Sequence, residues 1–462
     1  MSSEGERPGN DSATGRHAAE KRPLTSVRTR QEHIAHIAKK YRDSPLTTLS
    51  YHLDMLWMRE AFSRLNKDSA PGVDGVGVEI FAKDLEANLA RLLEEAKSGR
   101  YIPPPVKRVQ IPKSEKETRA IGMPTVGSKV LERAVTMLLE PIYENDFLDS
   151  SYGFRPDRSS HQALDRLRER LMEMKGGWVL DLDIRKYFDT IPHAQLKEIL
   201  RHRVKDTVIL RLIAKWLRAG IMENGELSAS REGTPQGGVI SPLLSNIYLH
   251  EVLDVWFETE IKPRLRDSAH LIRFADDSVM VFKRLDDAQR VLEVLSKRFE
   301  KYGLSIHPEK TRLVDFRHPW NSGKKPETFD FLGFTHYWGK TRKGGFSVKR
   351  KTASKKLRLR LQEVGEWCKK NRHKSLEWQH AKLCAKLQGH YAYYGIQGNH
   401  ASISAYRFRV IYLWRYWLNR RSRKRDGMNW DRFGALLKSK LHIPAARIVH
   451  GAIMSQQVCL SF

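Results

Sequence analysis

The stretch Leu271-Ile-Arg-Phe-Ala-Asp-Asp-Ser-Val-Met-Val-Phe282 sets two aspartates between two apolar runs. Residues 271–274 and 279–282 have the composition of β-strands, so the pattern predicts a hairpin with Asp276 and Asp277 at its tip. Two aspartates are also common in solvated turns that have no further role. The apolar strands on both sides favour a buried hairpin that presents its carboxylates for use.

A second acidic strand lies upstream, in Val179-Leu-Asp-Leu-Asp-Ile-Arg-Lys-Tyr-Phe-Asp189. The predicted strand over residues 178–183 ends at Asp183 and delivers a further carboxylate. Carboxylates that meet on adjacent strands repel one another and raise each other's pKa, which bound cations would relieve. Because neither stretch contains histidine or cysteine, such oxygen ligands favour Mg²⁺ over zinc. Two Mg²⁺ ions about 4 Å apart suit an in-line phosphoryl transfer.

Around these stretches, residues 105–335 alternate strands and helices, which indicates an α+β core. A further strand is predicted over residues 106–111, and helices are predicted over 130–139, 163–172, 196–200, 243–249 and 288–299. Helical periodicity also begins at about Gln31 and continues to residue 93, with a Pro/Gly-rich loop at 70–75. Residues 1–30 begin with a polar segment of little apolar periodicity, for which we expect a disordered tail.

The charge of the chain is strongly asymmetric. The 462 residues carry a net charge of +28, and residues 351–462 contribute +18 of it, from 23 Lys and Arg against 5 Asp and Glu. Helical periods within that basic region are strongest over 355–368 and 401–420. An excess of this size indicates a polyanionic partner, with nucleic acid favoured over an anionic membrane.

The sequence also predicts where the protein resides. It contains no run of about 20 apolar residues, so no membrane-spanning helix is expected. The N-terminus lacks the apolar core of a secretory signal. Cys368, Cys384 and Cys459 form no closely spaced pair, which argues against a zinc module or a disulfide framework. We therefore expect a soluble, cytoplasmic protein.

Eight sequence blocks match those of a known family, in order. They are Ser69-Ala-Pro-Gly-Val-Asp-Gly75, Ile111-Pro-Lys113 with Arg119-Ala-Ile-Gly-Met-Pro-Thr125, Ser151-Tyr-Gly-Phe-Arg-Pro156, the two aspartate stretches with Gly233-Thr-Pro-Gln-Gly-Gly238 between them, Gly303-Leu-Ser-Ile-His-Pro-Glu-Lys-Thr311, and Phe331-Leu-Gly-Phe334. With these blocks the chain resembles group II intron-encoded reverse transcriptases with maturase function, from about Gln31 to the end. An isolated Ala-Asp-Asp would be a weak signal, whereas eight blocks in register are specific.

The resemblance implies an RNA-directed DNA polymerase with a right-hand arrangement of fingers, palm and thumb. It implies an α+β fold with an antiparallel palm sheet and a helical, basic C-terminal maturase region. The implied divisions are a tail over 1–30, an N-terminal extension and the start of the fingers over 31–110, fingers and palm over 111–335, and the thumb with the maturase region (domain X) over 336–462.

The resemblance also implies a catalytic metal site. Asp183, Asp276 and Asp277 are the expected catalytic carboxylates. Two Mg²⁺ ions are expected, with Asp183, Ile184, Asp276 and Asp277 as ligands. Asp183 and Asp276 are expected to be the most direct of these.

Four further residues match positions that contact the incoming deoxynucleotide. Lys113 and Arg119 match residues that grip its triphosphate, although alone they would also fit a solvated basic hairpin. Phe188 matches the ring that would clash with a ribose 2′-hydroxyl, and alone it would equally fit a core aromatic. Gln236 matches the loop position that lines the nucleotide pocket, where the following glycines permit close approach of the backbone.

The C-terminal region resembles the part of the family that docks on intron RNA. Its basic run, Arg420, Arg421, Arg423, Lys424 and Arg425, is expected to contact nucleic acid. Aromatic residues at helical spacing precede this run. Exposed aromatics would stack on bases, whereas a packed helical bundle would bury them, and we expect most of them to be core.

The expected partners are intron RNA, template RNA with primer DNA, target DNA and deoxynucleoside triphosphates, with no membrane, and the oligomeric state stays open. The paired cysteines of an HNH-type endonuclease are missing from the sequence, so we expect an endonuclease-lacking member. Two other functions remain open. One is a CRISPR-associated or otherwise domesticated reverse transcriptase, and the other is a catalytically silent RNA-binding splicing factor.

Overall fold

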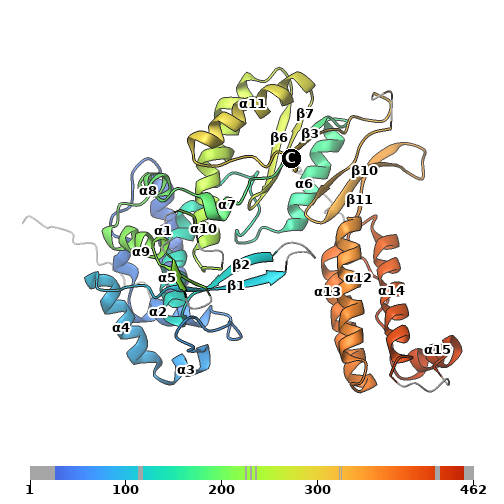
Figure 1. The fold of residues 1–462 in the computed structure, drawn as a ribbon. Coiled ribbons are helices and arrows are strands. Elements are labelled where there is room, and N and C mark those ends of the chain that lie inside the picture. The colour runs from blue at the N-terminus through green and yellow to red at the C-terminus, as the bar shows by residue number, and fades with distance from the viewer. Residues whose placement is uncertain are drawn as a thin grey trace, which may run out of the picture.

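The computed structural model describes residues 26–112, 118–223, 226–228, 232–234, 237–321, 323, 325–421 and 427–451. Helices and mainly antiparallel sheets are mixed along the chain, as the sequence predicts for an α+β protein (Figure 1). Lys113, Gln236, Arg423, Lys424 and Arg425 lie outside the described residues.

The N-terminal part packs helices around one long buried helix, α5. Its helices are α1 (Val27–Lys40), the 3₁₀ helix η1 (Leu49–His52), α2 (Met55–Ser63), α3 (Val78–Lys83), α4 (Leu85–Ser98) and α5 (Val126–Tyr143). The first helix begins at Val27, four residues before the predicted start, because Ser26 caps it by accepting a hydrogen bond from the backbone N–H of Thr29. Trp57 is fully buried and donates its indole N–H to the carbonyl of Ala134 in α5.

A small sheet stands beside these helices. Its strands are β1 (Val106–Pro112), β2 (Thr118–Met123), β4 (Ile221–Glu223) and β5 (Glu226–Ser228), in the order β2-β1-β4-β5. The β1–β2 pair is an antiparallel hairpin that projects from the body in Figure 1, and β1 pairs in parallel with β4. The predicted strand over 106–111 is therefore confirmed.

The central sheet contains both aspartate stretches. Its strands are β3 (Trp178–Leu182), β6 (Ala269–Phe274), β7 (Asp277–Phe282) and β8 (Arg312–Asp315), paired antiparallel in the order β6-β7-β3-β8. The predicted hairpin is confirmed, because Phe274 pairs with Asp277 across a two-residue turn. Since β7 also pairs with β3, one strand joins the two sequence stretches directly.

Both faces of this sheet are covered, which explains its long apolar runs. Leu180, Met280 and Phe282 point into a core shared with the N-terminal helices and α11 (Leu285–Lys301). Val179 and Val281 point into a second core that includes α6 (Ser160–Glu173). Successive side chains along each strand thus alternate between two separate cores, one on each side of the sheet.

Short helices complete the first core. They are α7 (Tyr187–Thr190), α8 (His193–Arg201), α9 (Thr207–Leu217), α10 (Ser241–Leu249), the π-helical turns η2 (His250–Val255) and η3 (Phe257–Ile261), and the 3₁₀ turn η4 (Lys262–Arg264). The helices predicted over 130–139, 163–172, 196–200, 243–249 and 288–299 correspond to α5, α6, α8, α10 and α11.

The C-terminal part contains a three-stranded sheet and a group of helices. The strands are β9 (Phe329–Phe331), β10 (Phe334–Lys340) and β11 (Phe346–Thr352), and the helices are α12 (Ser354–Asn371), α13 (Leu376–Tyr394), α14 (His400–Leu418) and α15 (Trp430–Ser439). Figure 1 shows α12, α13 and α14 side by side below the β10–β11 hairpin. The predicted helix over 355–368 is confirmed, and the one over 401–420 ends two residues early, at Leu418.

A buried ion pair holds the tip of the β6–β7 hairpin. Arg273 and Asp254 are both fully buried, and the Arg273 guanidinium donates to both Asp254 carboxylate oxygens at 2.8 and 2.5 Å. It also donates to the Asn246 side-chain oxygen and to the carbonyl of Ala275, each at 2.9 Å. The turn that presents Asp276 is thereby tied to the interior.

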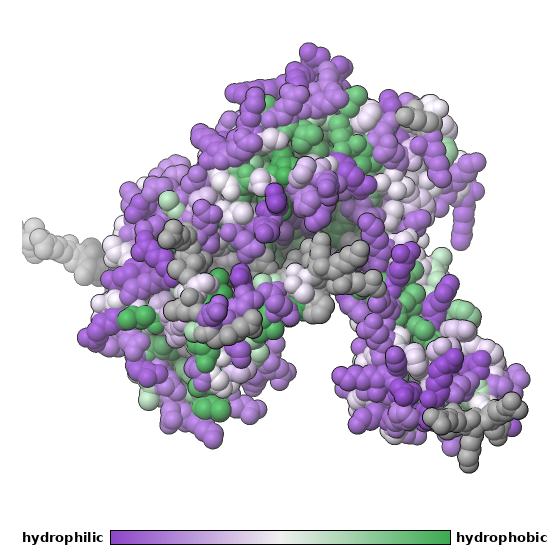
Figure 2. All heavy atoms as spheres, viewed as in Figure 1, coloured by the Kyte–Doolittle hydropathy of each residue, from purple (hydrophilic) through white to green (hydrophobic). Residues whose placement is uncertain are grey.

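The surface is predominantly hydrophilic in the view of Figure 2. That view shows a wide notch between the N-terminal helices and the helices α12–α15. Among the described residues, no helix has both the length and the apolar character needed to cross a lipid bilayer.

We expect Asp254→Ala to lower the free energy of unfolding by about 3–5 kcal/mol, because it leaves the Arg273 charge buried and unpaired. Urea denaturation measures this change. The matched control is Glu86→Ala, which breaks the solvent-exposed bidentate pair with Arg59 and should leave the free energy of unfolding nearly unchanged. Equal losses in the two variants would contradict the importance of the buried pair.

Candidate active site

Asp183 and Asp277 lie opposite each other where two adjacent strands end. Leu182 pairs with Ser278 in the register of β3 and β7, so the next pair along is Asp183 with Asp277. Asp276 occupies the turn immediately before β7. The structure therefore brings together carboxylates that are more than ninety positions apart in the sequence.

The main chain of Asp183 is fixed by the segment that precedes β8. Its carbonyl accepts a hydrogen bond from the backbone N–H of His307 at 2.8 Å, and its N–H donates to the Thr311 hydroxyl at 3.2 Å. Ile184 pairs with Ile306 in the same segment. This gives a structural role to the block Gly303–Thr311, which holds the acidic strand end in place.

The turn that carries Asp276 is strained and tightly packed. Ala275 has a φ of +58°, a left-handed backbone conformation that residues other than glycine rarely adopt. Gly153 lies so close that a Cβ atom there would stand 2.2 Å from the Ala275 nitrogen. Tyr152 also donates its N–H to the carbonyl of Arg273 at 2.9 Å. The block Ser151–Pro156 therefore supports the turn, and only glycine fits at position 153.

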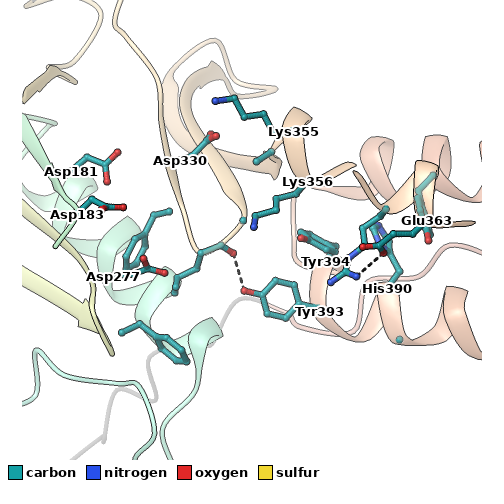
Figure 3. A pocket seen from close by; sticks show the side chains of 18 of the residues that line it. Asp181, Asp183, Asp277, Asp330, Lys355, Lys356, Glu363, His390, Tyr393 and Tyr394 are labelled. Atoms are coloured by element: carbon teal, nitrogen blue, oxygen red, sulfur yellow. Dashed lines mark hydrogen bonds and ion pairs between the residues drawn. The ribbon is translucent and has the colours of Figure 1, made fainter. Parts of the chain in front are cut away.

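A pocket of about 800 Å³ opens over these carboxylates. One side carries Asp181, Asp183 and Asp277 from the central sheet and Asp330 from β9, as Figure 3 shows. The lining also contains five basic side chains, most of them from α12: Lys310, Lys355, Lys356, Arg360 and Lys386. An acidic floor therefore faces a cationic wall, an arrangement that suits a ligand bearing phosphates together with cations.

The electrostatics of the floor reflect unbalanced negative charge. Loss of solvation in the concave site, reinforced by the negative charges of Asp276, Asp183 and Asp181, raises the pKa of Asp277 to about 6, although its side chain remains accessible. Lys356 acts in the opposite direction on the same carboxyl. Burial also raises the pKa of Asp181 to about 6, although the ion pair with Arg312 opposes that rise.

The donor set fits hard divalent cations. Carboxylate oxygens are the ligands such ions prefer, and bound cations would relieve the repulsion that adds to the loss of solvation in raising the pKa of Asp277. Ile184 has a buried hydrocarbon side chain, so only its carbonyl oxygen would serve as a ligand. Within the described ranges, no three His, Cys, Asp or Glu side chains converge closely enough to form a complete metal site. The expectation that Asp183 and Asp276 are the most direct ligands stays a prediction, and Asp277 is the neighbour that lines the pocket with Asp183.

Phe188 lies beside the Gly/Pro-rich loop. Its carbonyl accepts the N–H of Thr234 at 2.7 Å, and a Cβ atom at Gly233 would stand 2.7 Å from the same oxygen. On the other side of the loop, a Cβ atom at Gly237 would stand 2.2 Å from the carbonyl oxygen of Gly122 in β2. The loop thus spans from Phe188 to the β1–β2 hairpin. Arg119 lies on β2, where it pairs with Ile111.

Comparisons with known proteins agree with this geometry. Residues 111–336 match the family described as reverse transcriptase (RNA-dependent DNA polymerase). The chain is also 38% identical over 259 residues to protein YkfC of Escherichia coli strain K12, an alignment that covers 49% of this chain and 68% of that protein. The chain belongs to the reverse transcriptase family.

Other relatives of this reverse transcriptase have names that refer to introns. The chain is 37% identical over 226 residues to group II intron-encoded protein LtrA of Lactococcus lactis subsp. cremoris, covering 46% of this chain and 37% of that protein. It is 28% identical over 178 residues to nuclear intron maturase 2, mitochondrial, of Arabidopsis thaliana, covering 30% of this chain and 24% of that protein. The chain therefore spans well under half of each of these two relatives. The matches support a reverse transcriptase of the group II intron type, and this family uses divalent metal ions.

The structure separates the predicted C-terminal contacts from the pocket. Arg420 covers the ring of Tyr416, with its guanidinium carbon 3.6 Å from the ring centroid. Arg421 donates to the carbonyls of Arg372 and Lys374. These contacts position the two guanidiniums on the α12–α14 helices, away from the acidic floor of the reverse transcriptase.

Sequence reasoning missed one buried residue of this reverse transcriptase. Glu132 is 4% exposed, and its carboxylate accepts the N–H groups of Val239 at 2.5 Å and Ile240 at 3.3 Å. One turn earlier, Lys129 donates to the carbonyl of Ala70 at 2.7 Å. Helix α5 thus ties both the 69–75 block and the 233–238 loop to one element. A buried acid inside an apolar helical run is the signal that would have identified Glu132.

The missed residues of the pocket are Asp330 and the lysines of α12. Asp330 immediately precedes the block Phe331-Leu-Gly-Phe334, and Thr335 donates its hydroxyl to it. Lys355 and Lys356 stand in the first turn of α12. These residues lie more than 140 positions from Asp183 in the sequence, and local sequence periodicity cannot predict that they meet it in the fold.

We expect Asp277→Asn to stabilise the protein in the absence of divalent cations. The folded pKa of about 6 lies above the ordinary value of 3.8, so this carboxyl lowers the free energy of unfolding as pH rises from about 4 through 6. The variant lacks that decline, and its advantage in urea denaturation is therefore largest near pH 8 and disappears near pH 4. Added divalent cation should stabilise the wild type more than the variant. Parallel pH profiles of the two proteins would contradict the raised pKa of Asp277 in the folded protein.

We expect Glu132→Ala to loosen the loop that ends at α10. The variant leaves two buried N–H groups without their acceptor, at a cost of about 1–3 kcal/mol. Hydrogen exchange of the Val239 and Ile240 amides should accelerate by about tenfold or more, while amides in β3 stay protected. The control is Glu144→Ala, which removes the partner of Arg155 at the other end of α5. If that control accelerates the same amides equally, Glu132 has no local role.

Proposed function

We propose that this chain is an RNA-directed DNA polymerase encoded by a group II intron, which also binds intron RNA to assist splicing and retrohoming. The observation that carries the proposal is the meeting of Asp183 and Asp277 at adjacent strand ends, beneath a cationic wall. Phosphoryl transfer requires this combination of metal-binding oxygens with positive charges that hold a polyphosphate.

The parts of the right hand are assigned by their relation to this floor. The central sheet with α6 and α11 forms the palm, and the β1–β2 hairpin with the N-terminal helices forms the fingers. Helices α12, α13 and α14 form the thumb, and the maturase region continues from it. The cleft of the hand corresponds to the notch visible in Figure 2 and to the pocket of Figure 3.

Two Mg²⁺ ions would be held by Asp183, Asp276, Asp277 and the carbonyl oxygen of Ile184. When bound, the ions lower the pKa of the primer 3′-hydroxyl and neutralise charge on the departing pyrophosphate. The protein contributes a fixed frame, since Arg273 pins the turn and the 303–311 segment fixes Asp183. This rigidity keeps the carboxylates close despite their repulsion.

The incoming deoxynucleotide would lie between the β1–β2 hairpin and Phe188. Lys113 and Arg119 would hold its triphosphate, and Gln236 would line its pocket. The backbone of Phe188 is tied to the loop through Thr234, and from this anchored backbone its ring would exclude a ribose 2′-hydroxyl. Selection of deoxynucleotides would therefore depend on the rigidity of this contact.

The template and primer would lie along the cationic wall. Lys355 and Lys356 line the pocket without a described acidic partner, and Arg360 lines it while paired with Glu363 at 2.8 Å, so the wall keeps an excess of positive charge. Such a wall holds phosphates without reading base sequence, as a polymerase that copies any template requires. Target DNA would use the same cleft.

Intron RNA would bind the basic C-terminal region, including Arg420, Arg421, Arg423, Lys424 and Arg425. The names of LtrA and of nuclear intron maturase 2 support this role through similarity. Arg420 and Arg421 are held by an aromatic ring and by main-chain carbonyls, which orient the guanidiniums without cancelling their charge. Both therefore remain available to phosphates.

Primer extension on an RNA template tests the proposal. We expect purified wild-type protein to extend a DNA primer in Mg²⁺, and Asp276→Ala to lose activity by about a thousandfold or more while its RNA affinity stays nearly unchanged. The matched control is Asp330→Asn, which removes a carboxylate from the same pocket outside β3 and β7 and should retain activity within about tenfold. Undiminished extension by Asp276→Ala would refute the metal assignment. Absence of extension by wild type, with stimulation of intron splicing, would favour the silent splicing factor.

A further inference from the structure

Helix α14 exposes three large rings at a regular spacing. Phe408, Tyr412 and Tyr416 are 62%, 47% and 37% exposed, which is unusual for side chains of this kind. Positions four residues apart lie about 6 Å apart along a helix and on nearly the same side of it. We call these three residues the α14 stripe.

The three rings are not exposed because α14 lacks a buried side. Helix α14 also places Tyr406 and Trp414 in the second core, where they are 3% and 0% exposed. Trp414 donates its indole N–H to the Gln379 side-chain oxygen at 3.0 Å. The helix therefore buries aromatic residues on one side while it leaves a large part of each stripe ring exposed to solvent.

The stripe lies largely beyond the part of α14 that lines the polymerase pocket, since Tyr412 and Tyr416 stand about 9 and 15 Å farther along the helix axis than Tyr406. Tyr406 lines that pocket, and Phe408 lies two positions later, which is about 200° around the helix axis. A ligand on the stripe would therefore not compete directly with a primer and template in the cleft. The stripe is a separate surface of the C-terminal region.

Positive charge accompanies the stripe. The Arg420 guanidinium stacks over Tyr416, and the Arg415 guanidinium lies 4.2 Å from the ring centroid of Trp430 in α15. Trp430 is itself 42% exposed and lies 6.1 Å from Tyr412, centroid to centroid. The sequence of α14, His400–Leu418, contains no Asp or Glu. Aromatic faces and guanidiniums thus alternate along one surface.

We infer that the α14 stripe is a stacking platform for single-stranded RNA. Unpaired bases stack on aromatic rings and on guanidinium planes, while their phosphates are attracted to the same cations. A duplex hides its base faces and would meet only the charges. An acidic protein would use the charges but would have little use for a spaced series of flat rings. The inference deepens the proposed intron-RNA binding and rests on it only for the identity of the RNA.

The experiment measures RNA binding by the full-length protein while the cleft is occupied. A labelled, unstructured RNA oligonucleotide is titrated in the presence of excess unlabelled primer–template whose primer is chain-terminated. The same oligonucleotide annealed to its complement serves as the duplex probe. The test variant is Phe408→Ala/Tyr412→Ala/Tyr416→Ala, and the matched control is Tyr51→Ala, whose ring is 83% exposed on the 3₁₀ helix η1.

We expect the triple variant to bind the single-stranded probe at least about tenfold more weakly and the duplex probe less than about twofold more weakly. Tyr412→Phe/Tyr416→Phe should retain wild-type binding because the rings remain, and Tyr51→Ala should be unchanged. Primer extension on an unstructured template checks that the triple variant is folded. Failure of wild type itself to extend primers would refute the polymerase proposal and leave the stripe to be judged by binding alone.

Several results would overturn the inference. Unchanged binding by the triple variant would exclude the stripe as an RNA site. An equal loss for single-stranded and duplex probes would show that charge, not stacking, governs the surface. Sedimentation equilibrium of a wild-type dimer that the triple variant abolishes, with RNA binding intact, would show instead that a second copy of the chain covers the stripe.

Discussion

The buried pair of Arg273 and Asp254 is the constraint on which the candidate site depends. The pair joins the end of strand β6 to the π-helical turn that follows α10. Arg273 also donates a hydrogen bond to the carbonyl of Ala275. A pair of this kind contributes little net stability over an apolar alternative, but it is costly to break and it specifies one geometry. Here that geometry is a strained turn that keeps Asp276 and Asp277 next to Asp183. The Arg273–Asp254 pair thus fixes the position of the turn, although it adds little to the stability of the fold.

The rest of the fold supports this arrangement from both sides of the sheet. One core fixes β3 against the N-terminal helices, and the other fixes the same strands against α6 and the C-terminal helices. The carboxylates therefore cannot move apart to relieve their repulsion, and loss of solvation together with this repulsion raises the pKa of Asp277. Function and stability oppose each other at this point, as is common in sites that bind cations.

Much of the fold was predictable because its elements have strong local patterns. The hairpin around Asp276 follows from two apolar runs, and α5 and α11 follow from helical periodicity. The proximity of Asp183 and Asp277 was expected from the family resemblance. It depends on the order of the strands in the sheet, which the local sequence pattern does not encode. Glu132 and Asp330 escaped prediction because their partners lie about a hundred or more positions away or in another sheet. The aromatic residues of α14 could be sorted into core and surface only with the bundle in view, which shows Trp414 buried and Tyr412 exposed.

Direct metal binding tests the central claim of this account. Mn²⁺ takes the same oxygen ligands as Mg²⁺ and is observed by electron paramagnetic resonance. The measurement is made in the presence of primer–template and a non-extendable nucleotide. Wild type should bind Mn²⁺ tightly, and Asp330→Asn should bind it equally tightly. The double variant Asp183→Asn/Asp277→Asn should lose the tight binding. Tight binding that survives in the double variant would contradict the account, because the strand ends of β3 and β7 would then not be the metal site.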